Sequence, residues 1–186
     1  MAQIKDVNYG PLTGLIGTWV GDKGKDVSPE PDGTETNLYN ETIIFKGAFD
    51  LDNAEEQHLS AVHYEQQVHR IADNKVIHQQ TGYWLWEVDT NKVINSLTIP
   101  RGMSVLAGGE FSESESGEIK FEVSAKEEGN WKIIQTPFMH NKAKMKTFDQ
   151  TFTLNGAQLS YTQSMMLDIY GREFEHTDEN TLVKQG

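Results

Sequence analysis

Apolar and polar residues alternate with a period of two along much of this chain, and no other feature constrains the fold as strongly. The alternation is clearest over 119–126, where Ile119, Phe121, Val123 and Ala125 interleave with Lys120, Glu122, Ser124 and Lys126. Successive side chains of a β-strand point to opposite faces, so such a segment buries one face and exposes the other. The pattern therefore predicts strands that are half buried and half solvated.

The same alternation recurs over 147–154 and ends at Asn155-Gly156. An Asn-Gly pair between two alternating runs is the strongest short signal for a β-hairpin. Beyond this turn Leu159, Tyr161, Gln163, Met165 and Leu167 share one face, and the chain turns again near 170–172 into a last strand. We expect the C-terminal third to be an antiparallel meander.

Earlier segments predict further strands separated by polar turns, at 17–25, 38–47, 58–71, 76–88, 92–100 and 102–111. Short helical turns are expected at 11–16 and 139–145. Nine or ten consecutive hairpin-connected strands normally close into an up-and-down β-barrel, because closure removes exposed edges. A barrel of this size leaves room for a small ligand. We therefore expect one all-β barrel domain over 1–186 with an internal cavity.

Composition excludes several classes of function. The net charge of −12 argues against nucleic acid, because binding phosphates requires clustered Lys and Arg. The chain contains no cysteine, which excludes disulfides and thiolate chemistry. Neither a leader at Met1–Asp6 nor an apolar run of about 20 residues is present, which predicts a cytoplasmic protein without a membrane span.

Several motifs resemble those of one family, the nitrobindin-type barrels. Gly17-Thr18-Trp19-Val20-Gly21 resembles the family's Gly-x-Trp-x-Gly opening, which lipocalins share in part. The segments 80–84 (Gln-Thr-Gly-Tyr-Trp), 99–102 (Ile-Pro-Arg-Gly) and 159–165 (Leu-Ser-Tyr-Thr-Gln-Ser-Met) resemble later family motifs in the same order. The resemblance spans 11–184 and implies a lipocalin-like or nitrobindin-like barrel.

The resemblance implies a haem cofactor and one ligand residue. Nitrobindins bind haem iron through a histidine at the start of the last strand, and the matching residue here is His176, whose neutral imidazole suits that role. The resemblance also implies that the other axial face of the haem is left open for nitric oxide or peroxynitrite. Peroxynitrite isomerisation would follow from bound haem, and the enzyme status stays open. Both the Gly21–Gly24 segment and the segment after His176 are one residue longer than the family pattern. Unless a β-bulge absorbs such an insertion, the side chains beyond it point to the opposite face of the sheet.

Strand geometry predicts which way His176 points. Phe174 and His176 share one face, and Glu173 and Glu175 share the other. Burying two glutamates in an Arg-poor chain is costly, whereas burying Phe174 is favourable by roughly 2 kcal/mol. We expect the Phe174/His176 face to point into the barrel.

Other residues are candidates for the cavity wall. Tyr161 and Met165 share the inner face of their strand, and Trp84 lies on a face with His78, Gln80 and Gly82 that forms either a ligand wall or core packing. Arg101 is one of three arginines, and it or Tyr161 would anchor a ligand carboxylate. Four histidines at 58, 63, 69 and 78 do not predict a metal site, because His63 and His69 lie about 20 Å apart on one strand.

Three functions follow as hypotheses. The first is haem binding through His176. The second is an iron-free carrier of a small hydrophobic molecule, similar to lipocalins or fatty-acid-binding proteins. The third is a filled barrel that acts through its acidic outer surface. The sequence contains no nucleophile elbow, phosphate loop or other catalytic set, and it leaves the oligomeric state open, a homodimer included.

Overall fold

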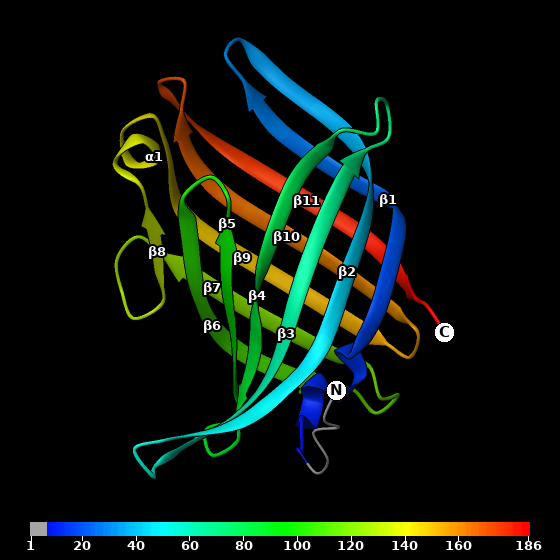
Figure 1. Ribbon diagram of the computed structural model, residues 1–186. Helices are drawn as coiled ribbons and strands as arrows, with labels where there is room; N and C mark the ends of the chain where they lie inside the picture. The colour runs from blue at the N-terminus through cyan, green and yellow to red at the C-terminus, as the bar shows by residue number, and fades with distance from the viewer. Residues whose placement is uncertain (1–6) are drawn as a thin grey trace.

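Strands form most of the chain in the computed structural model, which describes residues 7–186 (Figure 1). The residues Met1–Asp6, used above in the search for a leader, lie outside this range. The elements are η1 (Gly10–Leu15, a 3₁₀ helix), β1 (Gly17–Glu30), β2 (Gly33–Asn53), β3 (Gln57–Arg70), β4 (Val76–Glu87), β5 (Lys92–Ile99), β6 (Met103–Glu113), β7 (Ile119–Lys126), β8 (Lys132–Gln135), α1 (Pro137–Lys142), β9 (Ala143–Asn155), β10 (Gln158–Ile169) and β11 (Arg172–Lys184).

The strands close into one barrel in the order β1-β11-β10-β9-β7-β8-β6-β5-β4-β3-β2. The all-β class, the closed barrel and the short N-terminal helical turn are confirmed. The described chain has eleven strands instead of nine or ten, because β8 was not predicted. This strand has four residues, too few for a period of two to be visible, and it fits between β6 and β7, pairing antiparallel to β6 and parallel to β7.

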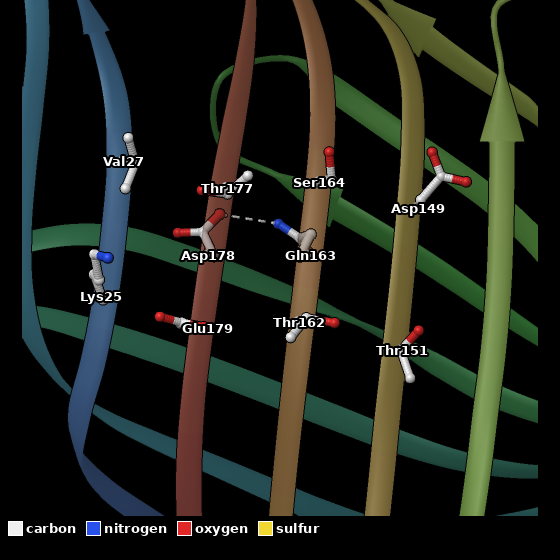
Figure 2. Close-up of a pocket in the computed structure, with 10 residues that line it drawn as sticks. All are labelled: Lys25, Val27, Asp149, Thr151, Thr162, Gln163, Ser164, Thr177, Asp178 and Glu179. Carbon is white, nitrogen blue, oxygen red and sulfur yellow. Dashed lines mark hydrogen bonds between the residues drawn. The ribbon is translucent and has the colours of Figure 1, made fainter.

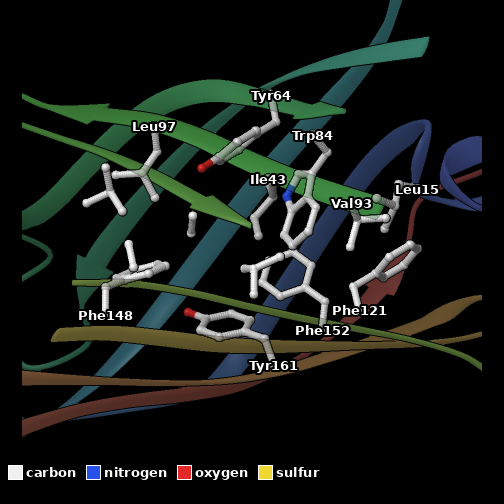
Figure 3. Packing of buried hydrophobic residues seen from close by; sticks show 14 of the residues in the cluster. Leu15, Ile43, Tyr64, Trp84, Val93, Leu97, Phe121, Phe148, Phe152 and Tyr161 are labelled. Carbon is white, nitrogen blue, oxygen red and sulfur yellow. The ribbon is translucent and has the colours of Figure 1, made fainter. Parts of the chain in front are cut away.

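One end of the barrel is closed by η1 and a large apolar core. Leu12 and Leu15 of η1 are fully buried, and Trp19 Nε1 donates a hydrogen bond to the Leu15 carbonyl oxygen at 2.7 Å. Aromatic rings fill the adjoining interior, among them Phe121 and Phe152, which both pack against Trp84 (Figure 3). Among the described residues, no helix has the length and apolarity needed to cross a bilayer.

A β-bulge in β1 decides which residues of that strand face inward. Against β2, Gly21 pairs with Glu41 and Gly24 pairs with Tyr39, so β1 carries one extra residue between these pairs. Before the bulge Trp19 and Gly21 are buried, and after it Gly24 and Asp26 are buried. The bulge absorbs the extra residue and turns Asp26 into the barrel, because a one-residue shift exchanges the two faces of a strand.

Gly24 is required at the bulge by close packing. A Cβ atom at Gly24 would lie 2.0 Å from the ring of Tyr39, which packs directly over the glycine. Gly82 on β4 is constrained by backbone instead, since a Cβ there would lie 1.9 Å from the carbonyl oxygen of Ser96 on β5. The close approach at Gly82 is therefore to the backbone of a neighbouring strand.

Candidate functional site

A cavity of about 480 Å³ lies inside the barrel at the end opposite η1. It lies among the turns that join β1 to β2, β3 to β4, β5 to β6 and β10 to β11, near the upper end of the barrel in Figure 1. One part of its wall is apolar and rich in methionine; the residues are Val68, Ile99, Met103, Met139, Met145, Met165, Leu167 and Ile169. Flexible thioether side chains adapt to irregular ligands, so this wall suits a bulky apolar group.

Another part of the wall is polar and centres on His176. His176 Nε2 lies 2.7 Å from Asp26 Oδ1 and 3.6 Å from Asp178 Oδ2. Asp26 Oδ2 accepts further hydrogen bonds from Ser28 Oγ at 2.9 Å and Asn37 Nδ2 at 3.1 Å. The bulge in β1 is what makes this group, because without it Asp26 would face outward.

Inward-facing polar residues on five neighbouring strands extend this group around the barrel. Asn37 pairs with Asp26, Asp26 with Asp178, Asp178 with Gln163, and Gln163 with Gln150. Gln150 Nε2 donates to Gln163 Oε1 at 2.9 Å, and Gln163 Nε2 donates to Asp178 Oδ2 at 3.3 Å; Figure 2 shows this second bond between β10 and β11. The row gives the cavity one hydrophilic side.

Burial and pairing shift the pKa values of this group in opposite directions. Burial would lower the pKa of His176, but the hydrogen bond with Asp26 and the charges of Asp178 and Asp26 outweigh it and raise the pKa. Burial would likewise raise the pKa of Asp26, but hydrogen bonds from His176 and Asn37 hold it below its usual value. Burial raises the pKa of Asp178 to about 6. The shifts of Asp26 and His176 both favour the charged forms, and therefore an ion pair between them.

A second buried carboxylate, that of Glu41, is hydrogen-bonded to residues that line the cavity. Glu41 accepts hydrogen bonds from Asn180 Nδ2 at 2.7 Å, from Tyr161 Oη at 3.1 Å and from Gln66 Nε2. The Tyr161 hydroxyl also lies 2.7 Å from the Tyr39 hydroxyl. Burial raises the pKa of Glu41 to about 7, although its three partners oppose the shift.

His78 on β4 is a second histidine of the cavity wall. Its Nε2 lies 3.0 Å from Gln80 Oε1, and Gln80 Nε2 donates to the Tyr64 hydroxyl at 2.9 Å. Burial lowers the pKa of His78, so its imidazole is neutral at neutral pH.

A shallower hollow of about 440 Å³ lies over β1, β9, β10 and β11 (Figure 2). Its lining is dominated by charged and hydroxyl side chains, including Lys25, Asp149, Thr151 and Glu179. Among the described residues, Val27 is the one hydrophobic residue of its lining, and Lys25, Asp149 and Glu179 are exposed, whereas binding sites for small molecules are usually lined by hydrophobic side chains. The larger cavity is the candidate functional site.

Comparison with known proteins bears on this geometry. The model of the family described as "THAP4-like, heme-binding beta-barrel domain" matches residues 8–184. The chain belongs to this family. The resemblance to nitrobindin-type barrels is thereby confirmed, and family membership supports haem as the cofactor of this THAP4-like barrel.

Among solved structures, the THAP4-like barrel is similar to the crystal structure of Rv2717c from M. tuberculosis. The TM-score is 0.72 and the sequence identity is 22%, over 97% of this chain and 100% of that one. At this identity the likeness concerns the fold alone. No curated protein matches the chain.

The THAP4-like barrel places the predicted site residues in two groups. His176, Tyr161, Met165 and Arg101 line the cavity. Glu173 and Glu175 are exposed, which agrees with the facing predicted from strand alternation.

Trp84 and Phe174 lie elsewhere. Trp84 is fully buried in the core of the THAP4-like barrel, with ring centroids 5.7 Å from Phe121 and 5.2 Å from Phe152. Phe174 is half-buried, and Arg172 Cζ lies 5.5 Å from the centroid of its ring. Phe174 is not among the residues that line the cavity. Core packing, the second interpretation of the Trp84 face, describes Trp84 correctly.

Sequence reasoning missed the role of Asp26. The residue lies 150 positions from His176, and its inward facing depends on the bulge at Gly21–Gly24. The extra residue between these two glycines was the available signal, but its length alone does not say where a bulge forms.

Proposed function

We propose that this chain binds haem in the 480 Å³ cavity and that His176 would hold the iron. The observation that carries the proposal is the position of His176 on the cavity wall, where it pairs across the sheet with Met165 of the methionine-rich apolar surface. Family membership supports the cofactor, and the position of the imidazole supports the ligand.

The residues present fit haem in their polarity. The macrocycle is apolar, and the wall formed by Met103, Met145 and Leu167 offers it a water-excluding surface. The propionate groups are anionic, and Arg70, Lys75 and Arg101 line the same cavity where it meets the turns. These cations would hold propionates at the open end.

The contact between His176 and Asp26 also fits an iron ligand. Metal-binding histidines usually have one ring nitrogen on the metal and the other on a carboxylate or carbonyl, which fixes the ring and raises its basicity. Asp26 holds Nε2 of His176 at 2.7 Å, which leaves Nδ1 as the second donor of the ring in this arrangement. Ligation through Nε2 would instead require the contact to open.

Bound haem would supply an iron that can bind a small gas or oxidant, such as nitric oxide or peroxynitrite. The protein's own contribution is to hold the imidazole, to exclude water with the methionine wall and to present His78 as a neutral hydrogen-bonding group in the same cavity. Isomerisation of peroxynitrite is the catalytic activity that would follow.

Haemin titration of the purified protein tests the proposal. We expect a saturating 1:1 change in the Soret band that His176→Ala abolishes. The matched control is His140→Ala, because His140 is an exposed histidine on α1. A spectrum that is unchanged by His176→Ala would exclude His176 as the ligand.

A second candidate is an iron-free carrier of an apolar molecule with a carboxylate. The observation that favours it is Arg101, which lies exposed at the cavity and forms no ion pair with the described residues. Tyr161 is a poor anchor, because its hydroxyl is engaged by Glu41 and Tyr39. Displacement of a fluorescent fatty-acid probe from wild-type protein and from Arg101→Ala tests it, and affinity that is equal in the two proteins would refute the anchoring.

A further inference from the structure

We propose that Asp26, His176 and Asp178 form a binding site for one divalent transition-metal ion of the zinc class. The side chains come from two neighbouring strands, β1 and β11, and all three line the cavity. One ligand atom from each lies within 4.8 Å of the others. The site goes beyond haem binding, because it needs only these three side chains.

The measured distances suit a small coordination sphere. Ligand atoms about 2.1 Å from a tetrahedral zinc ion lie roughly 3.4 Å from one another. The separations from His176 Nε2 to the Asp26 and Asp178 oxygens are 2.7 and 3.6 Å, on either side of that value. Small side-chain rotations would therefore bring the three atoms around one ion, and the open cavity leaves the remaining position to water or a ligand.

The charges of the group point to a cation. Two carboxylates on the inner wall meet one imidazole, and the ion pairs that they form within residues 7–186 both go to His176. Even with the imidazole protonated, one negative charge is left over. Such a charge is costly away from bulk water, and a divalent ion would neutralise it.

Hydrogen bonds are unevenly shared between the two carboxylates. Asp26 Oδ2 accepts from Ser28 and Asn37, which holds the carboxylate as outer partners hold a metal ligand and leaves Oδ1 facing His176. Asp178 accepts from Gln163 through Oδ2 alone, and its Oδ1 accepts no hydrogen bond from the described residues. Asp178 Oδ2, the atom 3.6 Å from His176 Nε2, accepts this one hydrogen bond and keeps a lone pair for a metal ion.

The donor set determines the class of ion. One imidazole nitrogen and two carboxylate oxygens suit Zn²⁺, Co²⁺, Fe²⁺ or Mn²⁺, whereas Mg²⁺ and Ca²⁺ favour sites made of oxygen alone. Calcium in particular takes six to eight oxygen ligands, which this group does not offer.

Titration of haem-free, chelator-treated protein with Co²⁺ tests the site, because Co²⁺ absorbs in the visible when protein ligands hold it. We expect a saturating 1:1 signal that Zn²⁺ displaces. Asp178→Asn and, separately, Asp26→Asn should weaken Co²⁺ binding by more than the roughly 10–100-fold that loss of an outer partner costs. The matched control is Glu179→Gln, next to Asp178 but on the exposed face of β11, which should bind Co²⁺ like the wild type.

Absence of a saturable 1:1 signal with the wild-type protein would overturn the metal site, and so would equal Co²⁺ affinity in the wild type and both asparagine variants. Circular dichroism of each variant confirms the barrel before titration. Haemin titration of the same metal-free wild-type protein is read separately in the Soret band. Failure of one titration and success of the other therefore separates the metal site from haem binding.

Discussion

The hydroxyl of Tyr161 lies 3.1 Å from each carboxylate oxygen of Glu41, within the buried interior of the barrel. Burial raises the pKa of Glu41 to about 7, so the folded protein holds a proton that the unfolded chain releases near the ordinary value of 4.5. The folded state binds more protons between these two values, and stability therefore falls as pH rises through this window.

We expect Glu41→Gln to remove this part of the pH dependence and to stabilise the protein above pH 7. The gain is on the order of 3 kcal/mol at pH 8, since one pKa unit corresponds to about 1.4 kcal/mol. Thermal unfolding from pH 5 to pH 8 measures it, with the exposed Glu65→Gln as the control for loss of one charge. Parallel curves for wild type and Glu41→Gln would contradict the prediction.

Arg172 should hold the tip of the β1–β2 hairpin near the cavity. Its Nη2 donates to the carbonyl oxygen of Glu30 at 3.1 Å and to that of Gly33. We expect Arg172→Ala to speed amide hydrogen exchange over 29–35 several-fold, because local opening loses these contacts. Arg172→Lys keeps the charge without the planar fork and should give an intermediate rate. Unchanged exchange in both variants would mean that the contacts do not restrain the hairpin.

Leu15 should contribute strongly to stability, because it closes one end of the barrel with a fully buried side chain. Leu15→Ala is expected to lower the free energy of unfolding by about 2–5 kcal/mol, through lost burial and the cavity left behind. Urea unfolding measures the loss. Leu38→Ala is the control, since Leu38 is 58% exposed and should change stability little. Comparable losses in the two variants would argue against a packed closure by η1.

Gly82 should tolerate no side chain. A Cβ atom there would meet the carbonyl oxygen of Ser96, and backbone cannot rotate away as a side chain can. Gly82→Ala should therefore destabilise the protein by about 1–3 kcal/mol in urea unfolding. Gly33→Ala, which faces open space, serves as the control. If Gly82→Ala is as stable as the wild type, the β4–β5 approach is looser than described.

Local sequence patterns predicted the fold, because the alternation of apolar and polar residues within each strand shows which side chains face the interior. The alternation over 119–126 and the Asn155-Gly156 turn each lie within one hairpin, and both correspond to elements of the barrel. The strand β8 escaped prediction because four residues carry too little periodicity, and its neighbours in the sheet are set by the closure of the whole barrel.

The site was predicted only in part, because its contacts join distant segments. Alternation on β11 was sufficient to predict that His176 faces inward. Its partner Asp26 depends on a bulge whose position follows from how Gly24 packs against Tyr39, a contact between two strands. Trp84 and Phe174 were predicted to line the cavity, but Trp84 packs in the core and Phe174 makes a cation–π contact with Arg172.

Because η1 and Trp19 close one end of the barrel, the cavity opens among the turns at the other end. Between the two ends, the described strands pair in a closed barrel, so the backbone of the wall is continuous. An incoming molecule and the water or ligand that it replaces must share the same opening, and two bulky molecules cannot pass each other there. Exchange of a bulky occupant is therefore sequential: the old one departs first, and its rate of departure limits how fast a successor is loaded, however concentrated that successor is.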